Sequence, residues 1–247
     1  MLRARTLIAM FVAVTLLVAC GDDDEPTAGG TTTTSSTSTS TTSTTSTTTS
    51  TTTTTTAPAE PAVVAVWPAA DVVFTTPEEA AEDFVSKALG VPPVLGNFQQ
   101  GDARSGEIEV FSPGEGGGGT SVLRSRLLLR QLGDQDGWFV IAAVNDNATI
   151  TAPKAQAEVP AGTVTVQGRA RGFEAAVVVE GFLPGSTEPL DQVVTQGGAM
   201  ETPEPYMAAL DLGGTAADDV VMLLVRGGTG LDEDPGEFSA VPITITG

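Results

Sequence analysis

The chain contains no histidine, and Cys20 is the single cysteine among its 247 residues. Without histidine the chain lacks the commonest general base and the commonest ligand of transition metals. One cysteine cannot form a disulfide within the chain, and it cannot by itself hold a zinc ion or an iron–sulfur cluster. We therefore expect no cofactor and no metal site, and we expect burial of apolar surface to hold the fold together.

Basic residues are scarce as well. The chain has 11 Lys and Arg against 31 Asp and Glu, which gives a formal net charge of −20. Such a chain lacks the basic footprint that nucleic acid requires, so we expect no nucleic-acid partner. Electrostatic adhesion to anionic lipid is disfavoured for the same reason. A high net charge of one sign favours a soluble and monomeric head.

The N-terminal segment has the pattern of an export signal. Arg3 and Arg5 precede an apolar run over residues 7–19 that only Thr15 interrupts. The run is too short for a bilayer-spanning helix, which needs about 20 residues. Its length suits the apolar region of a secretory signal, so residues 1–19 are predicted to be a signal peptide.

The end of this run, Leu17-Val18-Ala19-Cys20, resembles the lipobox of bacterial lipoproteins. The resemblance implies cleavage before Cys20 and acylation of its sulfur. The alternative is a buried cysteine in a plain signal or core helix, but the charged residues 21–25 cannot continue such a helix. We expect an extracytoplasmic protein that lipid on Cys20 anchors to the cell membrane of a bacterium. Without Arg3 and Arg5 the mature chain has 11 − 2 = 9 basic residues against 31 acidic ones, a net charge of −22.

Residues 20–60 are predicted to be the lipidated cysteine and a disordered tether. Every residue from 31 to 56 is Thr or Ser, and such a segment cannot bury apolar surface. As a flexible coil the tether would average roughly 35 Å from end to end, and fully stretched it would reach about 140 Å. Either a bare spacer or a strap stiffened by O-glycosylation fits this composition.

Residues 61–148 predict a small α+β domain of unassigned family, with one helix on an antiparallel sheet. Thr76 is a suitable N-cap, Pro77 suits the first helical position, and Glu79 completes a capping box. Apolar residues then recur at helical spacing up to Leu89. Strands are expected at residues 62–67, 107–110, 121–132 and 137–144.

The expected strand at 121–132 carries the only basic cluster of the acidic chain. Arg124, Arg126 and Arg130 fall on one side of it, and leucines fall on the other. These arginines are candidate contacts for an anionic wall polymer or a phosphate group. The alternative is a solvated sheet face whose arginines pair with acidic neighbours.

Residues 149–247 show no helical pattern and predict an all-β immunoglobulin-like sandwich. The folded part is therefore predicted to be mostly β and to consist of two domains. Turn signals separate short apolar or alternating runs, and the region lacks the Cys pair and the Trp of an antibody domain. Strands are expected at residues 150–151, 163–166, 173–180, 191–196, 206–212, 220–225 and 241–245.

One motif of this region, formed by Gly168, Ala170, Phe173 and Glu174, resembles the immunoglobulin-like domain of bacterial spore germination proteins. The resemblance covers about 149–247 and implies an envelope interaction module without known catalysis. Within it we expect Phe173 to be a core anchor, and we expect Glu174 to pair with Arg169 or Arg171.

Acidic residues cluster in two expected loops, at 218–219 and at 232–237. Carboxylates suit a hard cation, so these loops could bind calcium weakly, but solvated loops without a metal are the favoured interpretation.

Taken together, these patterns favour a non-catalytic, lipid-anchored envelope protein with an interaction or scaffolding role in the wall layer or periplasm. Its expected partners are the membrane, reached through Cys20, and an envelope protein or a wall polymer. Two alternatives remain open: a wall-glycan hydrolase acting through paired carboxylates, and a solute-binding component of a transporter.

Overall fold

The structure is a computed structural model, and it describes residues 63–114 and 121–247. The predicted signal peptide and the whole predicted tether at 20–60, Cys20 included, therefore lie outside the described residues. The described part is mostly β-strand, with one α-helix and sheets whose strand pairs are almost all antiparallel. The predicted mostly-β fold class is confirmed at this level.

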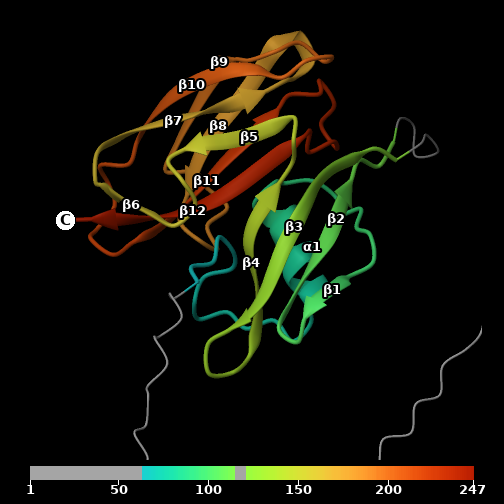
Figure 1. Cartoon of the computed structure of the whole chain (residues 1–247), viewed down its shortest axis with the longest axis vertical. Coiled ribbons are helices and arrows are strands. Elements are labelled where there is room, and N and C mark those ends of the chain that lie inside the picture. The colour runs from blue at the N-terminus through green and yellow to red at the C-terminus, as the bar shows by residue number, and fades with distance from the viewer. Residues whose placement is uncertain (1–62, 115–120) are drawn as a thin grey trace, which may run out of the picture. The chain divides into compact units, whose positions relative to one another are not determined.

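Helix α1 (Pro77–Lys87) has the predicted N-terminus. The Thr76 side chain accepts from the N–H of Glu79 at 3.3 Å, and the Glu79 carboxylate accepts from the N–H of Thr76 at 3.3 Å. Phe84 and four other residues of the helix are buried. Figure 1 shows α1 lying across one face of β3 and β4, and direct contacts join these elements.

Twelve strands lie in the described residues, and eight of them form the path β1-β2-β3-β4-β12-β11-β8-β9 of one large sheet. A second sheet has the order β10-β7-β5, and β6 pairs in parallel with β12. The first strands are β1 (Gln99–Asp102), β2 (Ser105–Phe111), β3 (Leu123–Leu132), β4 (Gly137–Val144), β5 (Ala148–Ala152) and β6 (Ala157–Pro160). The others are β7 (Thr163–Ala170), β8 (Ala176–Phe182), β9 (Asp191–Gln196), β10 (Glu204–Asp211), β11 (Val220–Gly227) and β12 (Phe238–Thr246).

Most of the predicted strands are present, and β4 and β9 have the predicted bounds. The strand predicted at 62–67 is wrong. Only an isolated bridge joins Trp67 to Val140, and Pro68 follows at once. Val66 and Trp67 are nonetheless fully buried, which explains the apolar pattern without a strand.

The first buried cluster lies between α1 and one face of the large sheet. It contains Phe84 and Val85 of α1, together with side chains from β2, β3 and β4. It also contains residues from much later in the chain, which are Phe182, Met222, Leu224, Phe238 and Ala240. The core beneath α1 therefore depends on β8, β11 and β12.

The second buried cluster consists only of residues from 148–245 and draws on both sheets. Val166 and Leu210 come from the second sheet, whereas Val179 and Ile243 come from the large sheet. These two sheets therefore face each other across a common apolar core.

Strand β11 separates the two clusters. Met222 and Leu224 belong to the first, whereas Val221, Leu223 and Val225 belong to the second. Successive side chains of a strand point to opposite faces, so β11 is buried on both sides. The predicted division at residue 148 into two separate domains is not confirmed, because the described residues belong to one compact unit.

Polar contacts of Arg226 also join the segment after α1 to the later strands. Glu180 of β8 lies 3.0 Å from Arg226 of β11, and Arg226 also donates to the carbonyl oxygen of Leu89 at 3.5 Å. Burial raises the pKa of Glu180, while Arg226 opposes this rise. The pair thus helps to fix α1 to β8 and β11.

Candidate functional site

The structure places the three predicted arginines on one face of β3. Arg124, Arg126 and Arg130 alternate with side chains that point into the first buried cluster, among them Leu127 and Leu129. The predicted shared face is thus present.

Two of these arginines are held by carboxylates. Arg124 forms an ion pair with Asp234, whose side chain is only 4% exposed. Arg126 Nε lies 3.5 Å from Glu107 Oε2 of the neighbouring strand β2. Both side chains are more than a third exposed. Much of the positive charge of this face is therefore neutralised locally.

The third arginine lies beside an open depression of about 370 Å³ on the outer face of β1–β4. The pKa of Asp102 is lowered, first by a hydrogen bond from the backbone of Arg104 and also by the charge of Arg130. The depression is lined by Arg130 and also by residues that include Gln99, Gln100, Glu107, Leu128 and Ile141. An anion in this depression would meet the Glu107 carboxylate as well as the Arg130 guanidinium.

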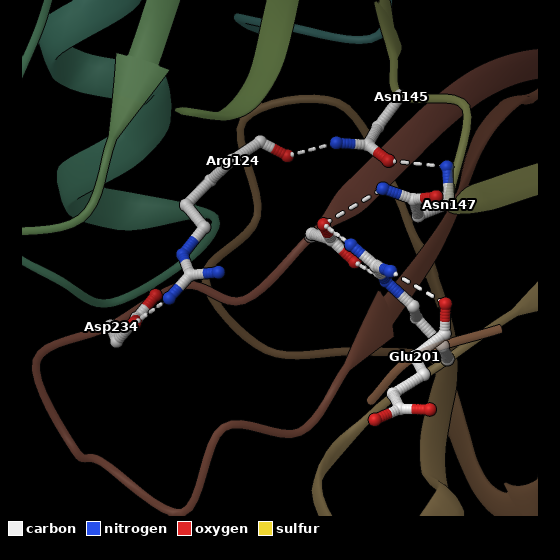
Figure 2. A network of polar contacts seen from close by, with 7 residues as sticks. Arg124, Asn145, Asn147, Glu201 and Asp234 are labelled. Carbon is white, nitrogen blue, oxygen red and sulfur yellow. Dashed lines mark hydrogen bonds and ion pairs between the residues drawn. The ribbon is translucent and has the colours of Figure 1, made fainter. Parts of the chain in front are cut away.

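A second polar cluster connects β3 and the β4–β5 connection with the loop before β12. Asn145 Nδ2 donates to the carbonyl oxygen of Arg124 at 2.8 Å, and Asn145 Oδ1 accepts from the N–H of Asn147 at 2.6 Å. Figure 2 shows Arg124 reaching Asp234 and Asn145 lying between Arg124 and Asn147. The β4–β5 connection is thereby fixed to β3 and to the loop before β12.

Arg171 and Glu237 form the most complete pair of this cluster. The guanidinium donates from Nε and Nη2 to the two carboxylate oxygens, each at 2.7 Å, and Asn147 Nδ2 donates to Glu237 at 2.9 Å. Burial raises the pKa of Glu237, but the bonds from Arg171 and Asn147 outweigh it and leave the pKa lowered. The predicted pairing of Arg169 or Arg171 with Glu174 is wrong, because Arg171 binds Glu237 and Arg169 donates to the carbonyl oxygen of Pro203.

These pairs also bear on the possible calcium loop at 232–237. Asp234 and Glu237 accept from arginines, so neither carboxylate is open to a cation. In residues 63–114 and 121–247, no group of three or more His, Cys, Asp or Glu side chains is arranged as metal ligands. A depression of about 220 Å³ beside the cluster is lined by Asn145, Asn147 and Glu237 among others, which already bond to neighbours.

Three loops meet at one end of the two-sheet region, and we call this surface the loop end. Its loops are residues 171–175, 197–203 and 228–237. Main-chain hydrogen bonds join them: Gly172 N–H to Gly198 O at 3.0 Å, Phe173 N–H to Gly228 O at 2.6 Å, and Gly197 N–H to Ala175 O at 2.9 Å. The Arg171 guanidinium adds a bond to the carbonyl oxygen of Glu201 at 3.1 Å.

The loops approach each other so closely that glycine is required. A Cβ at Gly227 would lie 1.9 Å from the carbonyl oxygen of Arg171. A Cβ at Gly172 would lie 2.8 Å from the backbone nitrogen of Gly228, and 2.2 Å from the carbonyl oxygen of Ala176 in its own segment. Real Cβ atoms do not approach oxygens this closely, so the glycines allow the backbones to touch. The loop end is therefore a packed structure rather than three independent loops.

Phe173 lies on the surface of the loop end, with 49% of its area exposed. The predicted role of Phe173 as a core anchor is wrong. Glu174 and Ala175 both have left-handed backbones, with φ of 53° and 59°, and the strand β8 begins only after them. Such conformations cost about 1–3 kcal/mol each for a residue other than glycine. They leave Phe173 outside the core that its apolar character suggested.

The other two loops expose large apolar side chains in the same way. Met200 is 52% exposed and Leu231 is 51% exposed. Each apolar tip is followed directly by acidic residues, in the sequences Phe173-Glu174, Met200-Glu201 and Leu231-Asp232-Glu233. Sequence reasoning missed this surface, because the three short motifs lie far apart in the chain. The antiparallel order of the strands is the signal that could have placed the three loops at one end.

The chain matches no known family model, no curated protein and no solved structure. Within the described ranges, no helix is long and apolar enough to cross a membrane. Cys20, the predicted lipidation site, lies outside the described residues.

Proposed function

We propose that the protein is a non-catalytic interaction or scaffolding protein, which lipid on Cys20 holds at the outer face of a bacterial cell membrane. The lipobox-like Leu17–Cys20 and the charged residues directly behind it support the anchor. The Thr and Ser run at 31–56 supports a spacer that displays the folded part at a distance from the membrane.

We further propose that residues 149–247 form an immunoglobulin-like sandwich of the spore germination type, preceded by an α+β domain at 61–148. The second buried cluster supports the first part of this proposal, since it lies between two facing sheets. The helix α1 and the strands β1–β4 support the second part, with the addition that later strands complete their core.

One observation carries the interaction role. The loop end combines interlocked backbones with apolar side chains that are about half exposed, at Phe173, Met200 and Leu231. Folding gains nothing from leaving such side chains in water, and clustered exposed apolar groups mark interaction sites. The arginines of β3 support a binding role less directly, because Arg124 and Arg126 already have acidic partners.

The proposal is tested by cell fractionation with a Cys20→Ala variant of the full chain. Wild-type protein should remain in the membrane fraction after a high-salt wash and should be released only by detergent. The variant should leave that fraction while keeping the same thermal unfolding curve. A Ser35→Ala variant in the tether is the matched control and should behave as wild type. Retention of Cys20→Ala in the washed membranes would overturn the proposed anchor.

A further inference from the structure

We propose that the loop end docks a polypeptide segment of a second envelope protein, and that this segment contains both basic and apolar side chains. The inference rests on the proposed extracytoplasmic display and adds a surface and the chemistry of its partner.

The apolar part of the surface comes from all three loops. Single exposed hydrophobic residues are normal on protein surfaces. Here, however, Phe173, Met200 and Leu231 lie on loops that are hydrogen-bonded to one another, and a Cβ at Gly230 would lie 3.3 Å from the Phe173 ring. The tip of the third loop therefore lies against the tip of the first. Burial of these side chains would supply the apolar share of a binding energy.

The charged part of the surface is acidic. The arginine of the three loops, Arg171, is neutralised by Glu237, and the neighbouring Arg124 is neutralised by Asp234. Among the described residues no ion pair involves the remaining loop carboxylates, which are Glu174, Glu201, Asp232 and Glu233, and all four are exposed. Charge complementarity therefore selects a partner that brings lysine or arginine to the rim of the apolar tips.

Other occupants fit the surface less well. The segment 21–62 of this chain contains four acidic residues at 22–25 and no Lys or Arg, so it would be repelled. A second copy of the mature chain, with 11 − 2 = 9 basic residues against 31 acidic ones, carries the same net charge of −22. Anionic lipid, nucleic acid and anionic wall polymers are repelled by the exposed carboxylates. A small cation would leave the apolar tips in water, whereas a basic and apolar polypeptide segment uses both features.

The surface is also preorganised. The close backbone contacts at Gly172 and Gly227 and the left-handed residues Glu174 and Ala175 fix the loops before any partner arrives. A site that is already ordered loses less conformational entropy on binding. The left-handed backbones cost free energy in the isolated protein, and the proposed docking role explains why Phe173 is held outward.

The test is site-specific photocrosslinking with the full chain in its native host. A benzophenone amino acid is incorporated at position 173, 200 or 231. Control positions are 194 on β9 and 207 on β10, where Val194 and Met207 are even more exposed, at 68% and 61%. After irradiation, the crosslinked peptide is sequenced by mass spectrometry, so that both the partner and the contacting segment are identified.

The proposal expects one polypeptide to be captured at all three tip positions and not at the two controls, through a segment containing Lys or Arg among apolar residues. The double variant Glu174→Lys, Asp232→Lys should lower the yield at position 200 by about fivefold or more. Asp134→Lys, on the exposed β3–β4 turn, is the matched control and should leave the yield unchanged.

Four results would overturn the proposal: no capture at the tips above the controls, capture of glycan or lipid, capture through an acidic segment, or a yield that charge reversal leaves unchanged. Thermal unfolding of the double variant checks that both substitutions leave the fold intact. None of these results bears on membrane attachment through Cys20, which fractionation tests separately.

Discussion

The cluster beneath α1 and the cluster between the two sheets differ in where their residues come from. The second cluster is self-contained, since all of its members lie within residues 148–245. The first is not, because Phe182, Met222, Leu224, Phe238 and Ala240 come from strands of the other region. The first cluster and the elements around it, α1 and β1–β4, form the first region, and residues 148–247 form the second region. The first region therefore depends on side chains of the second for its core, whereas the core of the second region does not depend on the first.

This difference shows how the large sheet is assembled. Strands β11 and β12 contribute side chains to the second cluster, and other side chains of the same strands pack into the first cluster. Between the regions, the register of β4 and β12 contains a single pair, Ala143 with Ala240. Side-chain burial rather than strand pairing thus holds the first region in place.

The largest expected effect is on a chain truncated after residue 148. It keeps α1 and β1–β4 but loses β8, β11 and β12, which complete the first cluster. We expect it to show no cooperative unfolding transition by circular dichroism. A chain of residues 149–247 keeps the whole second cluster except Ala148 and should retain protected amides in hydrogen exchange. If the chain truncated after residue 148 unfolded cooperatively, the first cluster would not depend on β8, β11 and β12.

Two neighbouring substitutions on β11 sharpen the same comparison. Met222→Ala removes a side chain from the first cluster and Leu223→Ala removes one from the second, and each side chain is fully buried. Each should lower the free energy of unfolding by about 2–5 kcal/mol. Hydrogen exchange should distinguish them, because Met222→Ala should speed exchange in α1 more than in β7 and β10. If Met222→Ala sped hydrogen exchange equally in α1 and in β7 and β10, the two clusters would not respond separately.

The pair between Arg171 and Glu237 should make stability fall in acid. The folded-state pKa of Glu237 is lowered, so its contribution is present above the unfolded pKa near 4.5 and is lost as the pH falls through the lower folded value. Glu237→Gln should cost about 1–3 kcal/mol at neutral pH and should flatten this acid dependence. Urea unfolding at several pH values measures both effects. Glu233→Gln, on the exposed part of the same loop, should stay within about 0.5 kcal/mol of wild type.

The smallest effect is expected for the exposed Arg126 on the outer face of β3. Arg126→Gln breaks an exposed pair with Glu107 and should change the free energy of unfolding by less than about 1 kcal/mol. Arg124→Gln should cost more, since it leaves the buried Asp234 carboxylate without its cation. Chemical denaturation of the two variants makes the comparison. Equal losses would show that the burial of Asp234 does not matter to stability.

Local patterns predicted much of the fold. The capping box at Thr76 and Glu79, the hairpin of β3 and β4, and the bounds of β9 all depend on residues close together in the chain. The alternation of β3 likewise placed Arg124, Arg126 and Arg130 on one face. For these features, side-chain periodicity and turn chemistry carry enough information.

Features that depend on distant residues were not predictable in this way. The sequence predicts a strand at 220–225, but no neighbouring residue indicates that one face of this strand, β11, packs toward α1. Phe173 is apolar and was therefore expected in the core, but it faces outward. The two left-handed residues that follow it, Glu174 and Ala175, are seen only in the structure. The partner of Arg171 lies 66 residues away, so the nearer Glu174 was the simpler expectation.

We propose that lipid on Cys20 holds the folded part at the outer face of the cell membrane. This proposal is tested most directly by mass spectrometry of the N-terminal peptide from detergent-extracted protein. We expect a mature chain that begins at Cys20 and carries the added mass of acyl groups on that residue. A peptide that retains residues 1–19, or one in which Cys20 carries no added mass, would contradict it.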